Sequence, residues 1–313
     1  MYSGSSRYKV FIDRAANESE KLVCAVAHPC DDVSFASAIS ARQQGIFEPV
    51  LVGPRARLAK VAKGLGIDLN AFQVRDTPHS HASADAAVDL VKLGQADLLM
   101  KGSLHTDELM HAVLGGQSGL RTNRKLSHVF IMDVPGHAGL LFITDAAINI
   151  FPDLETKADI VRNAIELHHA LGLGKPKVAI LSAVEQINGK IPSTIDAAAL
   201  CKMADRGQIE GGIVDGPLAL DNAISPDAAR IKGIHSKVAG YAQILVVPDL
   251  EAGNMLAKNL TFLSGAEAAG VVVGARVPII LTSRADSEQT RLASCAVAVC
   301  YARWLLGRQL PAT

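Results

Sequence analysis

The feature that most constrains this chain is a repeated alternation of short aliphatic runs with longer segments that carry an apolar stripe. The runs are continuously apolar, as expected for strands buried on both faces of a parallel sheet. In 155–171, Ile160, Ala164 and Leu171 fall on one helical face. Strands that alternate with helices are typical of a doubly wound α/β fold. The runs are 22–27, 49–53, 97–100, 128–134, 140–146, 177–184, 211–216, 244–249 and 277–281, and the helical segments are 33–44, 82–93, 106–114, 155–171, 193–206, 251–264 and 287–306.

The charge balance and the composition exclude several classes of protein. The 313 residues include 31 basic and 31 acidic side chains, so no basic stripe for a nucleic acid is expected. With 49% hydrophobic residues the chain can bury a core, which excludes disorder. Aromatic residues make up 4%, so the surface offers few platforms on which bases could stack. We therefore expect a globular protein with no nucleic-acid partner.

Cysteine usage and the apolar stretches indicate the compartment. The five cysteines are dispersed, without the spacing of a disulfide framework or a zinc site, which favours a reducing cytosol. The longest apolar stretch, 266–281, is broken by charged residues, glycines and a proline, and a bilayer needs about 20 apolar residues. The polar start of the chain does not resemble a secretory signal. We expect a cytoplasmic protein with no membrane partner.

Polar loops after strands are the places to look for a site, because ligands of open parallel sheets bind beyond the carboxyl ends of the strands. In the loop 101–108, Lys101 and Ser103 supply a cation and a hydroxyl beside Gly102, which allows close backbone approach. Thr106 is expected to cap the following helix, whose free N–H groups would favour an anion. An ordinary capped turn is the alternative, and the two acids in the first helical turn favour it.

A second polar loop, 282–288, follows the last aliphatic run. Ser287 is expected to cap the next helix, which leaves Ser283, Arg284 and Asp286 in the loop. Arginine suits bidentate recognition of phosphate, and a hydroxyl beside a carboxylate can move a proton. The loop therefore predicts phosphate binding with proton transfer, and a salt-bridged turn is the alternative.

Aspartate-rich turns form a third group of candidate site residues. Asp215 and Gly216 close one aliphatic run, and Asn254 follows another, where its amide can hydrogen-bond a ligand. An Asx turn before a capped helix is the simpler interpretation of each.

Several chemical signatures are absent from the sequence. No GxGxxG follows a strand and no GxxxxGK[ST] is present, so the dinucleotide and P-loop fingerprints fail. The histidine pairs at 79/81 and 168/169 lack partners at metal-ligand spacing, so no metal site is expected. Cys30 lies near a helix start, where a thiol pKa can be lowered, but no general base accompanies it. A structural or substrate-proximal loop is therefore favoured over a cysteine nucleophile.

Five segments together resemble the phosphate acetyl/butyryltransferase family. They are KGSLHTDELMHAVL, GLRTNRKLSHVFIMD, TDAAINIFPDLETKADIVRNAI, VDGPLALDNAIS and VPDLEAGNMLAKNLTFLSGAEAAGVVVGARVPIILTSRADS. The likeness runs colinearly from about residue 20 to 305, which is more specific than any single motif. It is strongest to the butyryltransferase-like branch and to the acyltransferase part of bifunctional enoyl-CoA hydratase/phosphate acetyltransferase proteins.

The resemblance implies an architecture and an assembly. It implies two doubly wound α/β domains with a cleft between them, as in the isocitrate/isopropylmalate dehydrogenases, and a homodimer. On this basis we predict one discontinuous domain of residues 1–126 and 271–313 and a second domain of residues 127–270. Periodicity alone leaves these boundaries open.

The resemblance also implies a reaction, in which acyl-CoA and phosphate interconvert with acyl phosphate and CoA in a ternary complex. A carboxylate takes the proton of the CoA thiol, the thiolate attacks the acyl carbon, and serine and arginine stabilise the phosphate. Because acyl phosphate is already activated, no metal and no permanently bound cofactor is expected. CoA, acyl-CoA, acyl phosphate and phosphate are the expected small-molecule partners.

Single residues match the family's motifs. Ser283 and Arg284 match its catalytic Ser-Arg pair. The other matches are Gly102, Ser103 and Thr106 in a phosphate loop, and Asp215, Gly216 and Asn254 in cleft turns.

The chain departs from the acetyltransferase branch at three positions. Thr290 stands where that branch has a catalytic aspartate, so Asp286 is the candidate base by proximity. His111 replaces an arginine, and a second arginine is missing near residue 261. The candidate replacements for these cations are Lys101 and Arg121.

Two other functions stay open. One is a dehydrogenase of the same fold, for which paired acids or histidines around a divalent metal would be needed. The other is a non-catalytic module that binds CoA or acyl phosphate, which the replacement at Thr290 motivates.

Overall fold

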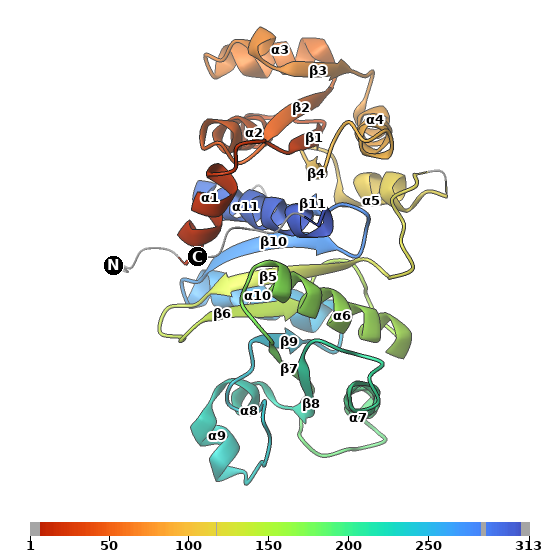
Figure 1. Cartoon of the computed structure of the whole chain (residues 1–313), viewed down its shortest axis with the longest axis vertical. Helices are drawn as coiled ribbons and strands as arrows, with labels where there is room; N and C mark the ends of the chain where they lie inside the picture. Colours follow the sequence, from red (N-terminus) through yellow and green to blue (C-terminus); the bar gives the residue numbers. More distant parts are fainter. Residues whose placement is uncertain (1–6, 117, 283–285, 308–313) are drawn as a thin grey trace. The chain divides into compact units, whose positions relative to one another are not determined.

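A computed structural model describes residues 7–116, 118–282 and 286–307 (Figure 1). The described chain groups into two compact units. The amino-terminal unit comprises residues 8–124 and the chain from 269 onward, and the central unit comprises Arg7 and residues 125–268. Arg7 donates to Asp133 Oδ1 at 2.6 Å, which ties it to the central unit, whereas the sequence placed it in the discontinuous domain. The expected domain boundaries themselves stay a prediction.

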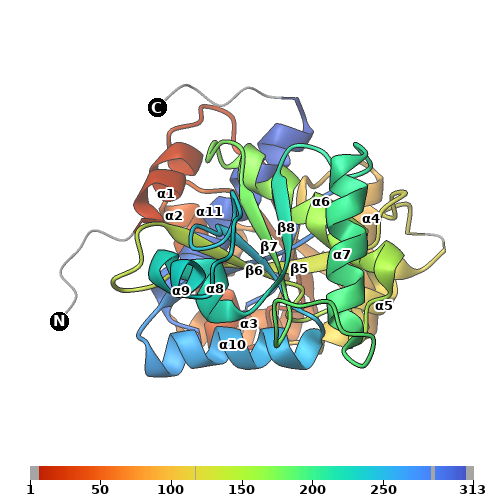
Figure 2. The same cartoon turned by 90° about the horizontal axis from the view of Figure 1, so that it is seen from below.

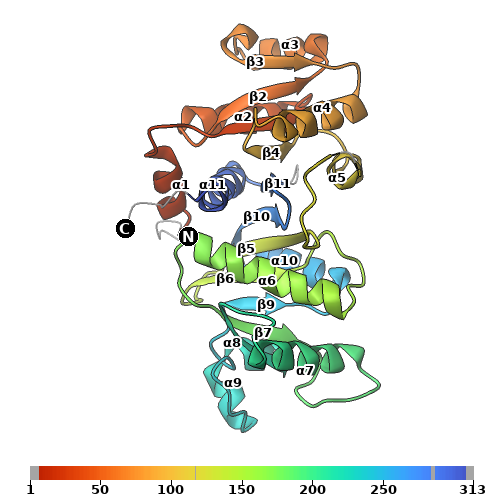
Figure 3. The ribbon, with the colours of Figure 1, turned by 45° about the vertical axis from the view of Figure 1, so that its right-hand side comes forward.

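The amino-terminal unit is a mostly parallel sheet with helices on both faces. Its strand order is β3-β2-β1-β4-β11-β10, and β10 runs antiparallel to β11. Helices α4 and α5 lie side by side (Figure 3), whereas α11 packs against α1 and α2. The strands are β1 (Val23–Ala27), β2 (Glu48–Gly53), β3 (Gln73–Asp76), β4 (Leu98–Lys101), β10 (Glu267–Val273) and β11 (Ile279–Ile280). The helices are α1 (Lys9–Ala16), α2 (Asp32–Gln43), α3 (Arg55–Gly64), the 3₁₀ helix η1 (Leu69–Ala71), α4 (Ser80–Lys92), α5 (Thr106–Leu114) and α11 (Glu288–Leu305).

Local sequence explains where these helices begin. The Asp31 side chain accepts a hydrogen bond from Ser34 N at 2.7 Å and caps α2. Ser287 caps α11 as predicted, because its hydroxyl accepts from Thr290 N at 3.1 Å. The strand-to-helix turns therefore lie at defined residues, and the polar groups of these turns gather at one edge of the sheet.

The central unit repeats this architecture. Its strand order is β5-β6-β9-β7-β8, with β5 antiparallel to β6 and the other neighbours parallel. Helices α7 and α8 lie on opposite sides of β7 and β8 (Figure 2). The strands are β5 (Ser127–Asp133), β6 (Leu140–Thr144), β7 (Lys177–Leu181), β8 (Ile213–Leu218) and β9 (Ile244–Val246). The helices are α6 (Leu154–Ala170), α7 (Pro192–Asp205), α8 (Leu220–Ile224), α9 (Pro226–Ile231) and α10 (Leu250–Leu263).

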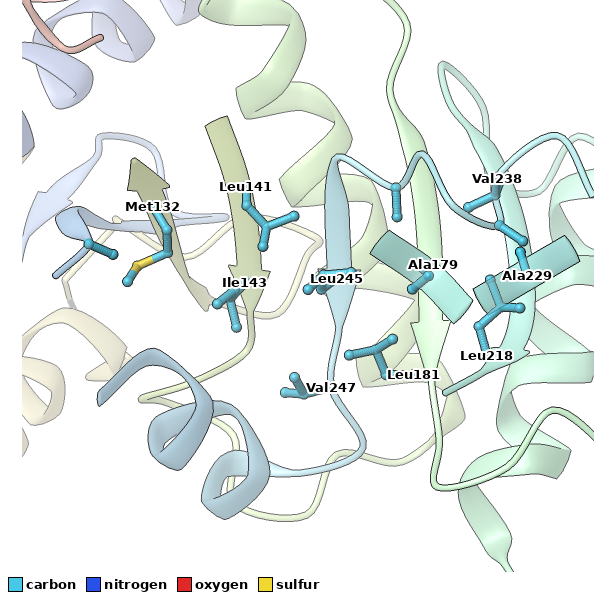
Figure 4. Packing of buried hydrophobic residues seen from close by; sticks show 14 of the residues in the cluster. Met132, Leu141, Ile143, Ala179, Leu181, Leu218, Ala229, Val238, Leu245 and Val247 are labelled. Atoms are coloured by element: carbon cyan, nitrogen blue, oxygen red, sulfur yellow. The ribbon is translucent and has the colours of Figure 1, made fainter. Parts of the chain in front are cut away.

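One core of the central unit lies between its strands and the helices α8, α9 and α10. Leu141, Ile143 and Leu245 are almost fully buried there (Figure 4). Leu256 and Leu260 of α10 pack against the same cluster. Burying one such side chain contributes roughly 1.5–3 kcal/mol. The alternation of aliphatic strands with striped helices is thus realised in both units, and the predicted α/β class is confirmed.

Two features are absent among the described residues. None of their helices combines the length and the apolar composition that a bilayer crossing requires. Within the same ranges, no group of three or more His, Cys, Asp or Glu side chains is arranged to hold a metal ion.

Candidate functional site

The site begins where β1 and β4 end, at the centre of the amino-terminal sheet. The chain leaves β1 towards β2 on one side and reaches β4 on the other, so the topology reverses at this point. Such a reversal is where open α/β sheets bind ligands. The loop after β1, 28–31, and the loop after β4, 102–105, therefore leave the sheet as neighbours.

Hydrogen bonds join these two loops. Ser103 N and Ser103 Oγ both donate to His28 O, at 2.9 and 2.8 Å. The same hydroxyl accepts from Cys30 N at 3.2 Å. A Cβ on Gly102 would lie 2.4 Å from Ala27 O, so only glycine allows this approach. The predicted phosphate-loop residues Gly102 and Ser103 thus hold the two loops together.

A pocket of about 380 Å³ is bounded by both loops. Its walls come from the starts of four helices, α2, α3, α4 and α5, and it falls in the usual size range of small-molecule sites. The lining residues are His28, Cys30, Asp31, Arg57, Ser80, Ser103, Leu104, His105 and Glu108.

The start of α5 differs from the prediction. His105, with an extended backbone (ψ 151°), is the N-cap residue and Thr106 is the first residue of the helix. Thr106 was expected as the cap, but its backbone is already helical. Lys101 Nζ turns back onto its own loop and donates to Gly102 O and Leu104 O, both at 3.3 Å. The lysine therefore braces the loop beside the pocket.

The thiol beside this pocket does not have the character of a nucleophile. Burial is the main cause that raises the pKa of Cys30 to about 11, Asp31 raises it further, and Arg57 opposes the shift. At neutral pH the thiol is protonated, and the thiolate is the reactive form. A protonated thiol is consistent with the predicted structural or substrate-proximal role of the loop that carries Cys30.

Two described residues that were predicted for the site, Arg121 and Asp286, are not among the lining residues of the pocket. Arg121 is exposed and pairs with Ala275 in an isolated antiparallel bridge. Asp286 accepts a hydrogen bond at its backbone oxygen from Arg291 Nη1. Ser283 and Arg284 lie outside the described residues. Strand β11, which precedes them in the sequence, runs parallel to β4.

In the central unit, the predicted turn residues are engaged with neighbouring backbone. Asp215 Oδ1 accepts from Gly216 N at 2.8 Å within β8. A Cβ on Gly216 would lie 2.6 Å from Ile180 O, so this glycine lets β8 approach β7 closely. Asn254 on α10 donates from Nδ2 to Ala146 O at 3.3 Å. These contacts build the carboxyl edge of the central sheet.

Asp145, directly after β6, is a polar centre of this edge to which the sequence analysis assigned no role. Its Oδ1 accepts from the backbone N–H groups of His128, Ala147 and Ile148, at 3.2, 3.0 and 3.1 Å. Its Oδ2 accepts from Asn149 N and Asn149 Nδ2, at 3.1 and 2.6 Å. Burial raises the pKa of Asp145, and the hydrogen bonds oppose that shift. The bond from Ala147 N, two residues on, makes this an Asx turn, for which an aspartate directly after an aliphatic run is the sequence signal.

Comparison with known proteins decides the family. The family model described as Phosphate acetyl/butaryl transferase matches residues 80–299. A phosphate acetyltransferase of Rhizobium meliloti is 66% identical over 92% of this chain and 91% of the relative. The chain belongs to the phosphate acetyl/butyryltransferase family. The predicted family and the class of enzyme, an acyltransferase, are confirmed, and the dehydrogenase and the non-catalytic module are disfavoured.

Both branches of this family are represented among the relatives. A phosphate butyryltransferase of Clostridium acetobutylicum is 43% identical over 92% of this chain and 95% of the relative. The crystal structure of a branched-chain phosphotransacylase from Enterococcus faecalis V583 has a TM-score of 0.78 and 32% identity, and covers 90% of this chain and 99% of that one. The likeness therefore extends over nearly the whole chain, including both units.

Sequence reasoning missed Arg57, which lines the pocket from the first turn of α3. The sequence pattern indicates no helix between the second aliphatic run and residue 82, so it marks no strand-to-helix turn there. Pro54, directly after β2 and before the first helical residue, is the signal that would have located this helix start.

Proposed function

We propose that this chain transfers an acyl group reversibly between CoA and phosphate. The observation that carries the proposal is the span of the family match, residues 80–299, which includes the loops after β4 and β11 and the turns of the central unit. CoA and acyl-CoA act as substrates in this proposal, and no resident cofactor or metal takes part.

In the proposed reaction the CoA thiolate attacks the acyl carbon of acyl phosphate directly. The S–C bond forms, the C–O bond to phosphate breaks, and the thiol proton passes first to a base and then to the departing phosphate. Asp286 is the proposed base, and a base of this kind contributes about 10²–10⁴-fold. Ser283 and Arg284 are proposed to stabilise the charge on the phosphoryl oxygens.

The phosphate is proposed to lie against the loop after β4. Thr106, the first residue of α5, is proposed to donate its backbone N–H to the phosphate, and Lys101 and Arg121 are the proposed cations. In the central unit, Asp215, Gly216 and Asn254 are proposed to face CoA. Gly102 and Ser103 are proposed to shape the loop around the phosphate, because Gly102 N donates to Ala27 O and both donors of Ser103 donate to His28 O.

The test is CoA-dependent turnover of C2 to C5 acyl phosphates by the full chain, measured as thiol loss and acyl-CoA formation. Turnover should persist in EDTA. The matched variants are Ser283→Ala and Arg284→Ala, which should lower kcat while the thermal midpoint stays unchanged. Absence of turnover with every acyl phosphate, by folded protein, would overturn the proposal.

We also propose a cytoplasmic homodimer. Apolar side chains on α10 support an interface between copies, because Met255, Phe262 and Leu263 are 64%, 71% and 80% exposed. Sedimentation of wild type and of Phe262→Asp tests it. A wild type that sediments as a monomer at micromolar concentration would contradict the dimer.

A further inference from the structure

The guanidinium of Arg57 lines the pocket and contacts the imidazole of His28. Its Nη1 lies 3.4 Å from Nε2 of His28. A guanidinium has five N–H donors and no acceptor, so Nε2 must be the acceptor in this contact. The other ring nitrogen, Nδ1, therefore carries the proton of the neutral imidazole. Arg57 keeps donors available to the pocket that it lines.

A buried chain of hydrogen bonds fixes the orientation of the His28 ring that contacts Arg57. Nδ1 lies 3.0 Å from Ser83 Oγ, and the hydroxyl of Ser83 donates to His79 O at 2.9 Å. Ser83 Oγ thus has lone pairs for Nδ1–H and for the hydroxyl of Thr77, which lies 2.8 Å away. His28 is 4% exposed and Ser83 is fully buried. Every proton in this chain of hydrogen bonds has an acceptor, so the ring is held in one orientation.

The backbone of His28 is held in a conformation that side chains rarely adopt. Its φ is +57°, in the left-handed region, and among the described residues no other non-glycine residue has a positive φ. Such strain persists where the surrounding structure fixes it, and it concentrates at functional sites. The hydrogen bonds that His28 O accepts from Ser103 tie this conformation to the loop after β4.

Two acids also line the pocket. Asp31 caps α2 through Ser34 N at 2.7 Å. Glu108 Oε2 is buried with no hydrogen-bond partner among the described residues, and it lies 3.7 Å from His81 Nδ1. Among the described lining residues, Arg57 is the one side chain with a permanent positive charge. The starts of α2, α4 and α5 add the partial positive charge of their free N–H groups.

We propose that this pocket binds a phosphate group of an organic substrate through Arg57, and that His28 is the positioning residue that holds the guanidinium there. The inference rests on the proposed function, because acyl phosphate and CoA are its phosphate-bearing substrates. Arginine suits this task because its planar fork matches phosphate oxygens. The volume of about 380 Å³ exceeds that of a bare ion and accommodates the organic part that carries the phosphate.

The first experiment compares Arg57→Ala with Arg55→Ala in steady-state kinetics. Both arginines are exposed on the first turn of α3, and Arg55 does not line the pocket. Loss of a charge-assisted contact to phosphate should raise one KM about tenfold to a hundredfold in Arg57→Ala, with kcat nearly unchanged. Arg55→Ala should leave every KM at the wild-type value. Equal KM values in the two variants would overturn the inference.

The substrate whose KM rises identifies the phosphate. A rise for acyl phosphate and inorganic phosphate places the transferred group in the pocket. If Arg57→Ala raises the KM for CoA but not the KM for 3′-dephospho-CoA, the 3′-phosphate lies in the pocket. If it raises the KM for both, the diphosphate lies there. A wild type without turnover would instead refute the proposed function, and calorimetric titration of both variants with CoA and with inorganic phosphate would then test the pocket by itself.

The positioning role of His28 is tested by a double-mutant cycle. His28→Asn removes the ring, and asparagine tolerates a positive φ better than most residues. If His28 acts through Arg57, His28→Asn raises the same KM as Arg57→Ala but by a smaller factor. The double variant should then match Arg57→Ala alone. Independent, multiplicative effects on that KM would refute the positioning role.

Discussion

The loops at the carboxyl ends of the parallel strands are used differently in the two units. In the central unit, the carboxylate of Asp145 is buried and accepts five hydrogen bonds from the chain around it. In the amino-terminal unit, the exposed guanidinium of Arg57 meets one side chain, His28, and lines a pocket. A saturated polar group can only hold its own turn, whereas a group with donors to spare can bind a ligand. We therefore interpret the Asp145 turn as scaffold and the Arg57 pocket as a binding site.

The largest effect should come from breaking the scaffold. Asp145→Ala leaves five N–H groups without their buried acceptor and should destabilise the protein by about 3–5 kcal/mol. Urea unfolding monitored by circular dichroism measures this. The control is Asp227→Ala, whose carboxylate is 83% exposed and pairs with Arg230, and which should change stability by less than about 0.5 kcal/mol. Comparable unfolding midpoints for the two variants would contradict the scaffold interpretation.

A second effect concerns the pH dependence of the same turn. His128, whose backbone N–H donates to Asp145, is fully buried, and burial lowers the pKa of its imidazole from 6.5 to about 4. The unfolded chain binds the proton between these values and the folded chain does not, so stability is complete above pH 6.5 and falls as the pH drops towards 4. The loss by pH 4 is about 3 kcal/mol.

The variant His128→Leu isolates this contribution. Its stability should fall by about 3 kcal/mol less than that of wild type between pH 7 and pH 4, because carboxylates titrate equally in both proteins. The exposed His235 provides the control, and His235→Leu should keep the wild-type profile. Parallel profiles for His128→Leu and wild type would show that His128 does not titrate in this way.

The nine aliphatic runs and seven helical segments found in the sequence all correspond to strands and helices of the structure, because burial on both faces leaves a strong pattern. Two of the missed elements lack that pattern. β3 is an edge strand of mostly exposed polar residues, and α3 buries only Leu58 and Ala62. β10 is different, because Val271, Val272 and Val273 are a buried aliphatic run, and the stretch 266–281 was considered only as a membrane span, which its charged residues, glycines and proline exclude. Burial of small or polar residues leaves little signal in the sequence.

The candidate site was predicted in part. The loop after β4 was found because it follows an aliphatic run and combines a glycine with polar side chains. The contact between Arg57 and His28 joins α3 to the loop after β1, and no local pattern encodes such a tertiary contact. The hydroxyl of Ser103 was expected to be available to phosphate, but it is committed to His28 O and Cys30 N. In the sequence, a side chain that joins two loops cannot be told apart from one that binds a ligand. Only the hydrogen-bond partners in the structure distinguish the two roles.

A smaller effect should follow from separating the two loops of the amino-terminal site. In Gly102→Ala the added Cβ would lie 2.4 Å from Ala27 O and 2.5 Å from His28 O, so the loops must move apart. Overpacking of this kind costs about 1–3 kcal/mol, and the KM that depends on Arg57 should rise as well. Gly64→Ala is the control, because a Cβ there meets nothing within 4 Å. An unchanged KM in Gly102→Ala would show that the position of the loop after β4 does not affect substrate binding in the pocket.

The smallest effect should be a pH dependence of substrate binding at the amino-terminal pocket, caused by protonation of His28. Burial lowers the pKa of His28, and Arg57 on α3 and His79 before α4 act in the same direction. Glu108 on α5 and Asp31 before α2 oppose them. Protonation places an N–H on Nε2, which removes the acceptor for the guanidinium and sets two cations side by side.

As the pH falls through this pKa, the KM that depends on Arg57 should rise in wild type by about two- to tenfold, the equivalent of one hydrogen bond. The ratio of KM in wild type to KM in Arg57→Ala removes the titration of the substrate itself, and it should rise as the pH falls from 7 through the pKa of His28, which lies below 6.5. Arg55→Ala should follow wild type throughout. After protonation the imidazole has no lone pair to accept from Arg57. A ratio that stays constant while His28 is seen to titrate by NMR would therefore exclude His28 as the group that positions the guanidinium.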